Sequence, residues 1–207
     1  VAPDAKDEAR KIVAGAVTSG SWGWRELILR VSDAGCAADF ALAESLPIDG
    51  VLLPKVERPE TVANAAAATR HALWCMIETP LGVLRAAEIA GCHPRLAGLV
   101  AGTNDLAKDL HARHVPDRTP LLTALSLILL AARGYGIAAL DGVHLELDDL
   151  EALEKACRQG VELGCDGKTL VHPNSVDIAN RVFGPDAEAV GAARATVVAC
   201  CWPFSVL

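Results

Sequence analysis

Aromatic residues are scarce in this sequence. Phe, Trp and Tyr together make up 4% of its 207 residues. Proteins that bind single-stranded nucleic acids commonly stack the bases on aromatic side chains, so no stacking platform of this kind is predicted here. The four tryptophans, Trp22, Trp24, Trp74 and Trp202, are expected to be packing residues instead.

The sequence also lacks a long apolar run and an excess of positive charge. The longest apolar stretch, 121–132, is shorter than the roughly 20 residues of a membrane-spanning helix, and we expect a buried helix and no membrane association. The formal net charge is -7 and the positive charges are scattered, which disfavours a nucleic-acid binder. The expected partner is a small molecule.

Several common site motifs are absent. The seven cysteines contain no Cys-x-x-Cys pair and have no regular spacing, so we predict neither a disulfide framework nor a cysteine zinc site, but reduced thiols in a cytoplasmic protein. A Gly-x-Ser-x-Gly elbow and a full glycine fingerprint are missing as well. These absences argue against the commonest serine hydrolase arrangement and against a nucleotide-binding loop.

The hydrophobic residues, 52% of the chain, are spread along its whole length, which predicts a single domain over 1–207. Short runs rich in Val, Leu and Ile alternate with Ala-rich stretches of helical period, a pattern typical of β/α units around a parallel sheet. Strands are predicted at 27–31, 50–54, 73–77, 96–101, 138–143 and 167–171. Helices are predicted at 4–17, 39–46, 59–71, 82–90, 121–135, 147–163 and 186–198. The fold class is therefore α/β, either a barrel or a doubly wound sheet.

Charged residues follow the apolar runs at the places where ligands bind in parallel α/β folds. Glu78 follows the third predicted strand and Asp105 the fourth, and two carboxylates at neighbouring strand ends form a common Mg²⁺ arrangement. Arg30 and Lys55, after the first two strands, are suited to hold a carboxylate or stabilise an enolate. The alternative is that Glu78 and Asp105 only cap helices.

Two further residues leave two interpretations open. Asp141, directly before Gly142, either contacts substrate or shapes the turn. His172, before Pro173, is either a base or a structural hydrogen-bonding residue, and we assign it no catalytic role.

Six segments resemble the HpcH/HpaI aldolase and citrate lyase beta subunit family. In chain order they are Leu-Arg-Val (29–31), Leu-Pro-Lys-Val-Glu (53–57), Met-Ile-Glu-Thr-Pro-Leu-Gly (76–82), Gly-Thr-Asn-Asp-Leu-Ala-Lys-Asp-Leu (102–110), Leu-Asp-Gly-Val (140–143) and Asp-Gly-Lys-Thr-Leu-Val-His-Pro (166–173). The resemblance covers nearly the whole chain.

The resemblance implies a TIM-type (β/α)8 barrel in which Glu78 and Asp105 bind Mg²⁺ and Arg30 binds the oxygens of a 2-oxo acid. Catalysis is assigned to Arg30, Lys55 and Glu57, and substrate binding to Arg30 and Asp141. The implied reaction is carbon–carbon lyase chemistry. A citryl-, malyl- or citramalyl-CoA type of β-hydroxyacyl-CoA is cleaved into an acyl-CoA and a 2-oxo acid, in a protein that forms trimers or hexamers.

The chain departs from the family pattern at both ends. The first two strands of the barrel and the C-terminal lid with its acidic residue have no counterpart, so about six β/α units are expected. Ser32 and His111 replace a usual asparagine and a usual glycine. The alternatives are an aldolase acting on a free hydroxy-oxo acid, thioester hydrolysis on the same scaffold, and a catalytically inactive fragment or binding module.

Overall fold

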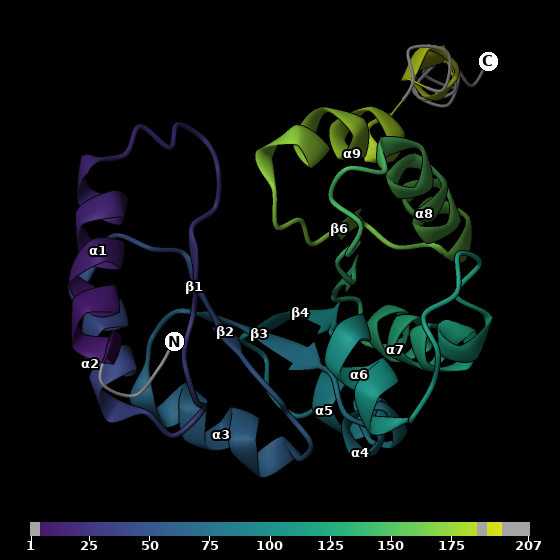
Figure 1. The fold of residues 1–207 in the computed structure, drawn as a ribbon. Coiled ribbons are helices and arrows are strands. Elements are labelled where there is room, and N and C mark those ends of the chain that lie inside the picture. The colour runs from purple at the N-terminus through teal and green to yellow at the C-terminus, as the bar shows by residue number, and fades with distance from the viewer. Residues whose placement is uncertain (1–4, 186–189, 196–207) are drawn as a thin grey trace, which may run out of the picture.

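The structure, a computed structural model, describes residues 5–185 and 190–195 and is built on one six-stranded parallel sheet. The strands are β1 (Ile28–Arg30), β2 (Gly50–Leu53), β3 (Ala72–Ile77), β4 (Leu96–Ala101), β5 (Ala138–Asp141) and β6 (Gly167–Lys168). Their order in the sheet is their order in the chain. The sheet curls into an open half-barrel with most helices on its outer side (Figure 1). The predicted α/β class with about six units is confirmed.

Most of the helices are crossover connections between one parallel strand and the next, while the first helix precedes β1. They are α1 (Lys6–Ser19), α2 (Ala37–Ser45), α3 (Pro59–Ala68), α4 (Pro80–Leu84), α5 (Ala86–Ala90), α6 (Thr103–Asp109), α7 (Leu122–Gly134), α8 (Leu150–Leu163) and α9 (Val176–Phe183), with short 3-10 turns η2 (Thr119–Leu121) and η3 (Pro173–Ser175). In Figure 1, α1 to α3 lie along one arm of the arc and α8 and α9 along the other.

Strand β3 shows why the sheet has two different faces. Leu73, Cys75 and Ile77 are fully buried, whereas the alternate residues Trp74 and Met76 are only partly buried. Because successive side chains of a strand point to opposite faces, one face of β3 packs into the main core and the other lines the inner side of the arc. Helix α7 contributes Leu125, Ile128 and Ala132 to the same core.

The strand register places the carboxyl ends of the strands along one edge. Arg30 at the end of β1 pairs with Leu52, Ile77 at the end of β3 pairs with Ala101, and Asp141 at the end of β5 pairs with Lys168. Residues that directly follow the strands are therefore neighbours in space, which is the geometry that the sequence analysis requires.

Some predicted elements need correction. The helix predicted at 82–90 is divided at Arg85 into α4 and α5, and helices α6 and α9 were not predicted. Residues 190–195 are helical, and the other positions of the helix predicted at 186–198, which are 186–189 and 196–198, lie outside the described residues.

The tryptophans do not all pack as predicted. Trp24 is 91% exposed and Trp22 is 39% exposed, and both lie in the loop between α1 and β1. The Arg25 guanidinium lies 5.8 Å from the centre of the Trp24 ring. Trp202 lies outside the described residues.

Cys36, Cys75, Cys92, Cys157 and Cys165 are all free thiols. None of the helices in the described ranges is long and apolar enough to cross a membrane.

Candidate active site at the strand ends

Glu78 is the buried acidic residue of the predicted metal pair. It follows β3 and is 4% exposed, and its Oε1 accepts a hydrogen bond of 2.9 Å from the backbone N–H of Lys55. The Nη2 of Arg30 lies 3.9 Å from the same oxygen. Burial raises the pKa of Glu78, since removing a carboxylate from water disfavours its charged form. The charge of Asp105 acts in the same direction, while the contacts with Lys55 and Arg30 oppose it.

Asp105 lies in the first turn of α6 and is the more exposed partner. Its side chain is 40% exposed, and its Oδ2 lies 3.7 Å from the Nζ of Lys55. Lys55 therefore contacts both carboxylates, Glu78 through its backbone and Asp105 through its side chain. The backbone of Lys55 is left-handed, with φ at +49°, a conformation that costs energy for a residue with a Cβ and is often retained at functional sites.

Gly102 brings the end of β4 against Glu78. A Cβ atom at this position would lie 2.2 Å from the Cβ of Glu78 and 2.9 Å from its Oε2. No residue larger than glycine fits without displacing Glu78, so the glycine of the Gly-Thr-Asn-Asp segment is required by close packing. It sets how closely α6, and with it Asp105, approaches the buried carboxylate.

The helix-capping alternative for the two carboxylates is not what the structure shows. Thr79 is the N-cap of α4, and its hydroxyl oxygen accepts the N–H of Gly82 at 3.1 Å. The N-cap of helix α6 is Gly102, which provides no side-chain cap. Glu78 and Asp105 are thus left facing the cations of the site.

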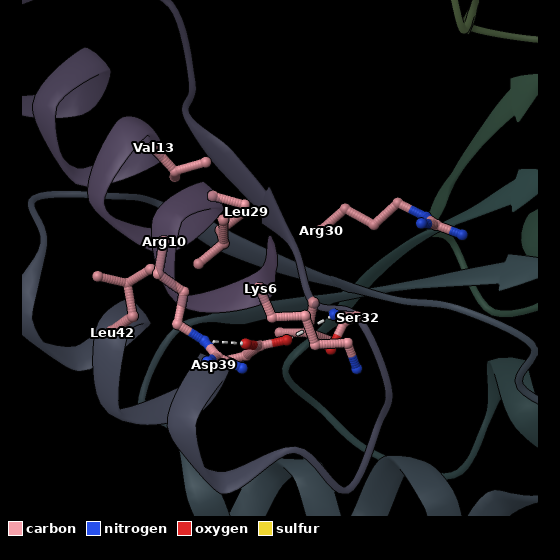
Figure 2. Close-up of a pocket in the computed structure, with 10 residues that line it drawn as sticks. Lys6, Arg10, Val13, Leu29, Arg30, Ser32, Asp39 and Leu42 are labelled. Atoms are coloured by element: carbon pink, nitrogen blue, oxygen red, sulfur yellow. Dashed lines mark hydrogen bonds and ion pairs between the residues drawn. The ribbon is translucent and has the colours of Figure 1, made fainter. Parts of the chain in front are cut away.

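Arg30 projects from β1 toward the inner side of the sheet. Its side chain is 52% exposed, and Figure 2 shows it extending toward the neighbouring strands and away from Asp39. A cavity of about 450 Å³ lies beside it, with Lys55 among its lining residues and polar side chains of α3, Thr61 and Asn64, on its other side. The cavity therefore borders both cations of the predicted site.

Asp39 anchors the residues that follow β1. In Figure 2 its carboxylate lies between Arg10 and Ser32, accepting a hydrogen bond of 2.8 Å from the Nε of Arg10 and one of 2.6 Å from the backbone N–H of Ser32. Burial acts to raise the pKa of Asp39, but these hydrogen bonds outweigh it and lower the pKa to about 2. Ser32, the residue that departs from the family pattern, is held here through its backbone.

Other predicted site residues lie apart from this group. Glu57 is partly buried and forms no hydrogen bond or ion pair within the described part of the chain. Asp141 is 1% exposed, and both of its carboxylate oxygens accept hydrogen bonds from Arg118. This geometry favours the turn-shaping interpretation of Asp141, and direct substrate contact stays a prediction. The Nδ1 of His172 accepts the N–H of Asn174 at 3.3 Å, a structural contact.

Arg118 and Lys168 were not singled out from the sequence. The Arg118 side chain is 13% exposed and that of Lys168 is 1% exposed, and both pair with Asp141. Lys168 lies within the strand predicted at 167–171 and ends the observed β6, so its position was a usable indication. Arg118 lies in an irregular segment after α6, and no local pattern marks it.

The donor set suits a hard cation held by few protein ligands. In residues 5–185 and 190–195, no cluster of three or more His, Cys, Asp or Glu side chains is arranged for a metal. Two carboxylates on neighbouring strand ends leave room for water and substrate oxygens, and Mg²⁺ is typically bound in this way.

The fold and the site define the class of protein as an α/β protein of the barrel type with acidic residues at its strand ends. The family model described as HpcH/HpaI aldolase/citrate lyase matches residues 1–173, and the chain belongs to this family. The resemblance of the six segments is thereby confirmed.

Curated relatives cover most of the chain. A (3S)-malyl-CoA thioesterase of Cereibacter sphaeroides is 42% identical over 203 residues, which are 96% of this chain and 71% of the relative. The citrate lyase subunit beta of Escherichia coli is 32% identical, over 94% of this chain and 69% of the relative. The relatives are enzymes, which supports lyase-type activity in this family.

Solved structures show the same fold with ligands. The citrate lyase beta subunit from Mycobacterium tuberculosis complexed with oxaloacetate and magnesium has a TM-score of 0.76 and 27% identity, covering 89% of this chain and 83% of that one. The CitE protein of the same organism in complex with magnesium, acetoacetate and coenzyme A has a TM-score of 0.78 and 28% identity. The match covers 99% of this chain and 79% of that one.

Proposed function

We propose that this chain is a Mg²⁺-dependent carbon–carbon lyase that cleaves a β-hydroxyacyl-CoA of the citryl, malyl or citramalyl type into an acyl-CoA and a 2-oxo acid. The observation that carries the proposal is the contact of Lys55 with both Glu78 and Asp105 at the ends of neighbouring strands. Relatives crystallised with magnesium and oxaloacetate, and with coenzyme A, support it.

Glu78 and Asp105 are the residues that would hold Mg²⁺. Their oxygens are the hard ligands that this ion prefers, and the close packing of Gly102 keeps the two carboxylates near each other. Bound there, Mg²⁺ supplies Lewis-acid polarisation of a substrate oxygen.

The cations of the chain have separate tasks in the proposed cleavage. The β-hydroxyl group gives its proton to water, and its carbon–oxygen bond becomes the carbonyl of the 2-oxo acid as the bond between the α and β carbons breaks. The electron pair of that broken bond passes to the thioester as an enolate. A proton then returns to the α carbon to give the acyl-CoA. Arg30 is placed to bind the carboxylate of the 2-oxo acid, and Lys55 lies where negative charge develops. Glu57 stays a predicted catalytic residue, and no step of the reaction is assigned to it.

A second function is favoured by the relatives named as thioesterases, which are 42% identical to this chain. A thioesterase would transfer the acyl group to water, releasing the hydroxy acid and free coenzyme A without breaking a carbon–carbon bond. The aldolase alternative without coenzyme A, the inactive module, and the trimer or hexamer remain further hypotheses for this chain.

The first experiment is a calorimetric titration with Mg²⁺, with and without oxaloacetate or glyoxylate. We expect binding that the oxo acid strengthens, and its loss in Glu78→Ala and Asp105→Ala. Glu88→Ala removes an exposed carboxylate from α5 and is the matched control, which should bind as the wild-type chain does. Absence of Mg²⁺ binding in a chain shown to be folded would contradict the proposed site.

A product assay then separates the two reactions. With malyl-CoA, lyase activity releases glyoxylate and acetyl-CoA, whereas thioester hydrolysis releases malate and a free thiol. Formation of free thiol without an oxo acid would refute the lyase proposal in favour of hydrolysis.

A further inference from the structure

A buried group of charged residues joins the ends of β5 and β6. The Arg118 Nη1 donates to both carboxylate oxygens of Asp141 at 2.7 Å, and the Lys168 Nζ donates to Oδ2 of Asp141 at 2.8 Å. Gln159 of α8 accepts a hydrogen bond of 2.6 Å from the Arg118 Nε. We call Arg118, Asp141, Lys168 and Gln159 the buried charge cluster. Two cations share one carboxylate here, an arrangement that is costly to bury unless each group is well bonded.

The residue that follows Asp141 packs against the start of α6. Gly142, which follows Asp141, donates its N–H to Oδ1 of Asp141 at 2.8 Å. It is packed so closely on Thr103, the first residue of α6, that a Cβ at Gly142 would lie 2.2 Å from the Thr103 hydroxyl oxygen. Asp105 lies in the same first helical turn as Thr103. The cluster is therefore linked, through Gly142 and Thr103, to the helix that carries Asp105.

Arg118 also marks the point where the irregular segment after α6 returns to the sheet. The chain departs from α6 at Asp109 and returns at Arg118, whose backbone is left-handed with φ at +53°. Gln159 donates a hydrogen bond of 2.7 Å to the carbonyl oxygen of Asp117, which holds the same return point. Helix α6 has seven residues, and Leu106 and Ala107 pack it into the main core. The contacts at Gly142 and at Arg118 add an attachment on each side of this short helix.

From these contacts we infer that Arg118, Asp141 and Lys168 are positioning residues that hold α6, and thereby Asp105, in place for the cation. The inference rests on the proposed function for its link to Mg²⁺. It gives Asp141 a role through its neighbours rather than through substrate. Outer partners of metal ligands typically change metal affinity by about 10–100-fold when they are removed.

Arg118→Met tests the inference, with Arg133→Met as the matched control. Arg133 also pairs with a carboxylate beside β5 and β6, since its Nη2 lies 2.7 Å from Oδ1 of Asp166. Asp166 precedes β6 and accepts the N–H of Ala139 on β5, so this pair joins the same two strands at their opposite ends. Both variants lose one guanidinium and one ion pair with a carboxylate. Only Arg118→Met removes a partner of Asp141, the residue before the Gly142 that packs against Thr103 of α6.

The first readout is hydrogen exchange of the backbone amides of α6, measured without any metal. In Arg118→Met we expect exchange of 103–109 to be at least tenfold faster, with β3 and β4 unchanged, and in Arg133→Met no change in α6. The second readout is Mg²⁺ affinity with oxaloacetate present, expected to be about tenfold weaker in Arg118→Met and within twofold of wild type in Arg133→Met.

The outcomes of these experiments separate the positioning role from the proposed Mg²⁺ site. Unchanged α6 exchange in a folded Arg118→Met chain, or equal acceleration in both variants, overturns the positioning role. If Arg118→Met does not fold, Gln159→Leu keeps the Arg118–Asp141 ion pair but removes the hydrogen bonds of Gln159 to the Arg118 Nε and to the Asp117 carbonyl oxygen. It should accelerate α6 exchange about threefold, whereas no change would overturn the inference. If the wild-type chain fails to bind Mg²⁺, the proposed function is wrong, and the exchange experiment still decides whether the cluster holds α6.

Discussion

At the scale of single residues, Asp39 shows how one carboxylate fixes three elements. It lies in α2, accepts hydrogen bonds from Arg10 of α1 and from the backbone after β1, and is only 7% exposed. Because the folded state lowers its pKa to about 2 from an ordinary 3.8, the ionised form stabilises the fold. This stability is fully present above the ordinary pKa and is lost as the pH falls toward 2.

Asp39→Asn should lower the free energy of unfolding at pH 7 by on the order of 2 kcal/mol. The difference from wild type should shrink as the pH falls from about 4 toward 2, where the wild-type carboxylate is also protonated. Urea denaturation across this range measures it. Asp7→Asn is the control, because Asp7 pairs with the same Arg10 but is 90% exposed, and it should change stability by less than about 0.5 kcal/mol. A deficit in Asp39→Asn that does not vary with pH would contradict the assignment.

The predicted site residues that follow strands lie near one another in the structure, whereas Arg118 and Lys168 were not singled out from the sequence. Glu78, Asp105, Arg30 and Lys55 follow apolar runs, so the parallel-sheet rule places them together without any structure. Arg118 reaches Asp141 from an irregular segment, and its contact depends on how that segment returns to the sheet. Local sequence patterns do not show where an irregular segment returns to the sheet.

At the scale of elements, the approach of β4 to β3 depends on Gly102. We expect Gly102→Ala to lower the free energy of unfolding by about 1–3 kcal/mol, because the added Cβ would overlap Glu78. Gly134→Ala in α7 is the control: a Cβ there meets nothing within 4 Å, and alanine should raise helix stability by up to about 1 kcal/mol. Urea denaturation of both variants distinguishes them, and equal effects would show that the close packing at Gly102 is not important.

The main elements were predictable and several boundaries were not. Strand β4 matches its predicted range, since its residues are almost all buried and apolar. Helix α6 was missed because its residues were assigned to the site segment, although Gly102 and Asp105 also mark a helix start. Helix α9 covers α8 with Ala179 and partly buried neighbours, a small second core that the sequence pattern did not separate from the flanking segments.

At the scale of the whole molecule, ligand binding at the strand ends should stabilise the entire fold. A ligand that binds only the folded state at 100 times its dissociation constant raises the free energy of unfolding by about 2.7 kcal/mol. We expect this increase with Mg²⁺ and oxaloacetate in wild type, and none in Asp105→Asn. Potassium chloride at equal ionic strength is the control. A similar increase in Asp105→Asn would show that the stabilising ion binds elsewhere.

The order of the strands has a consequence for how the protein is made on the ribosome. Because β1 to β6 are neighbours in chain order, each strand after the first meets a partner that has already been synthesised. Arg30, Lys55, Glu78 and Asp105 all precede residue 106, so the four groups can gather while the last two strands are still emerging. Arg118, Asp141 and Lys168 arrive afterwards. In the nascent chain, the residues of the proposed site would thus come together before the residues proposed to position them have been synthesised.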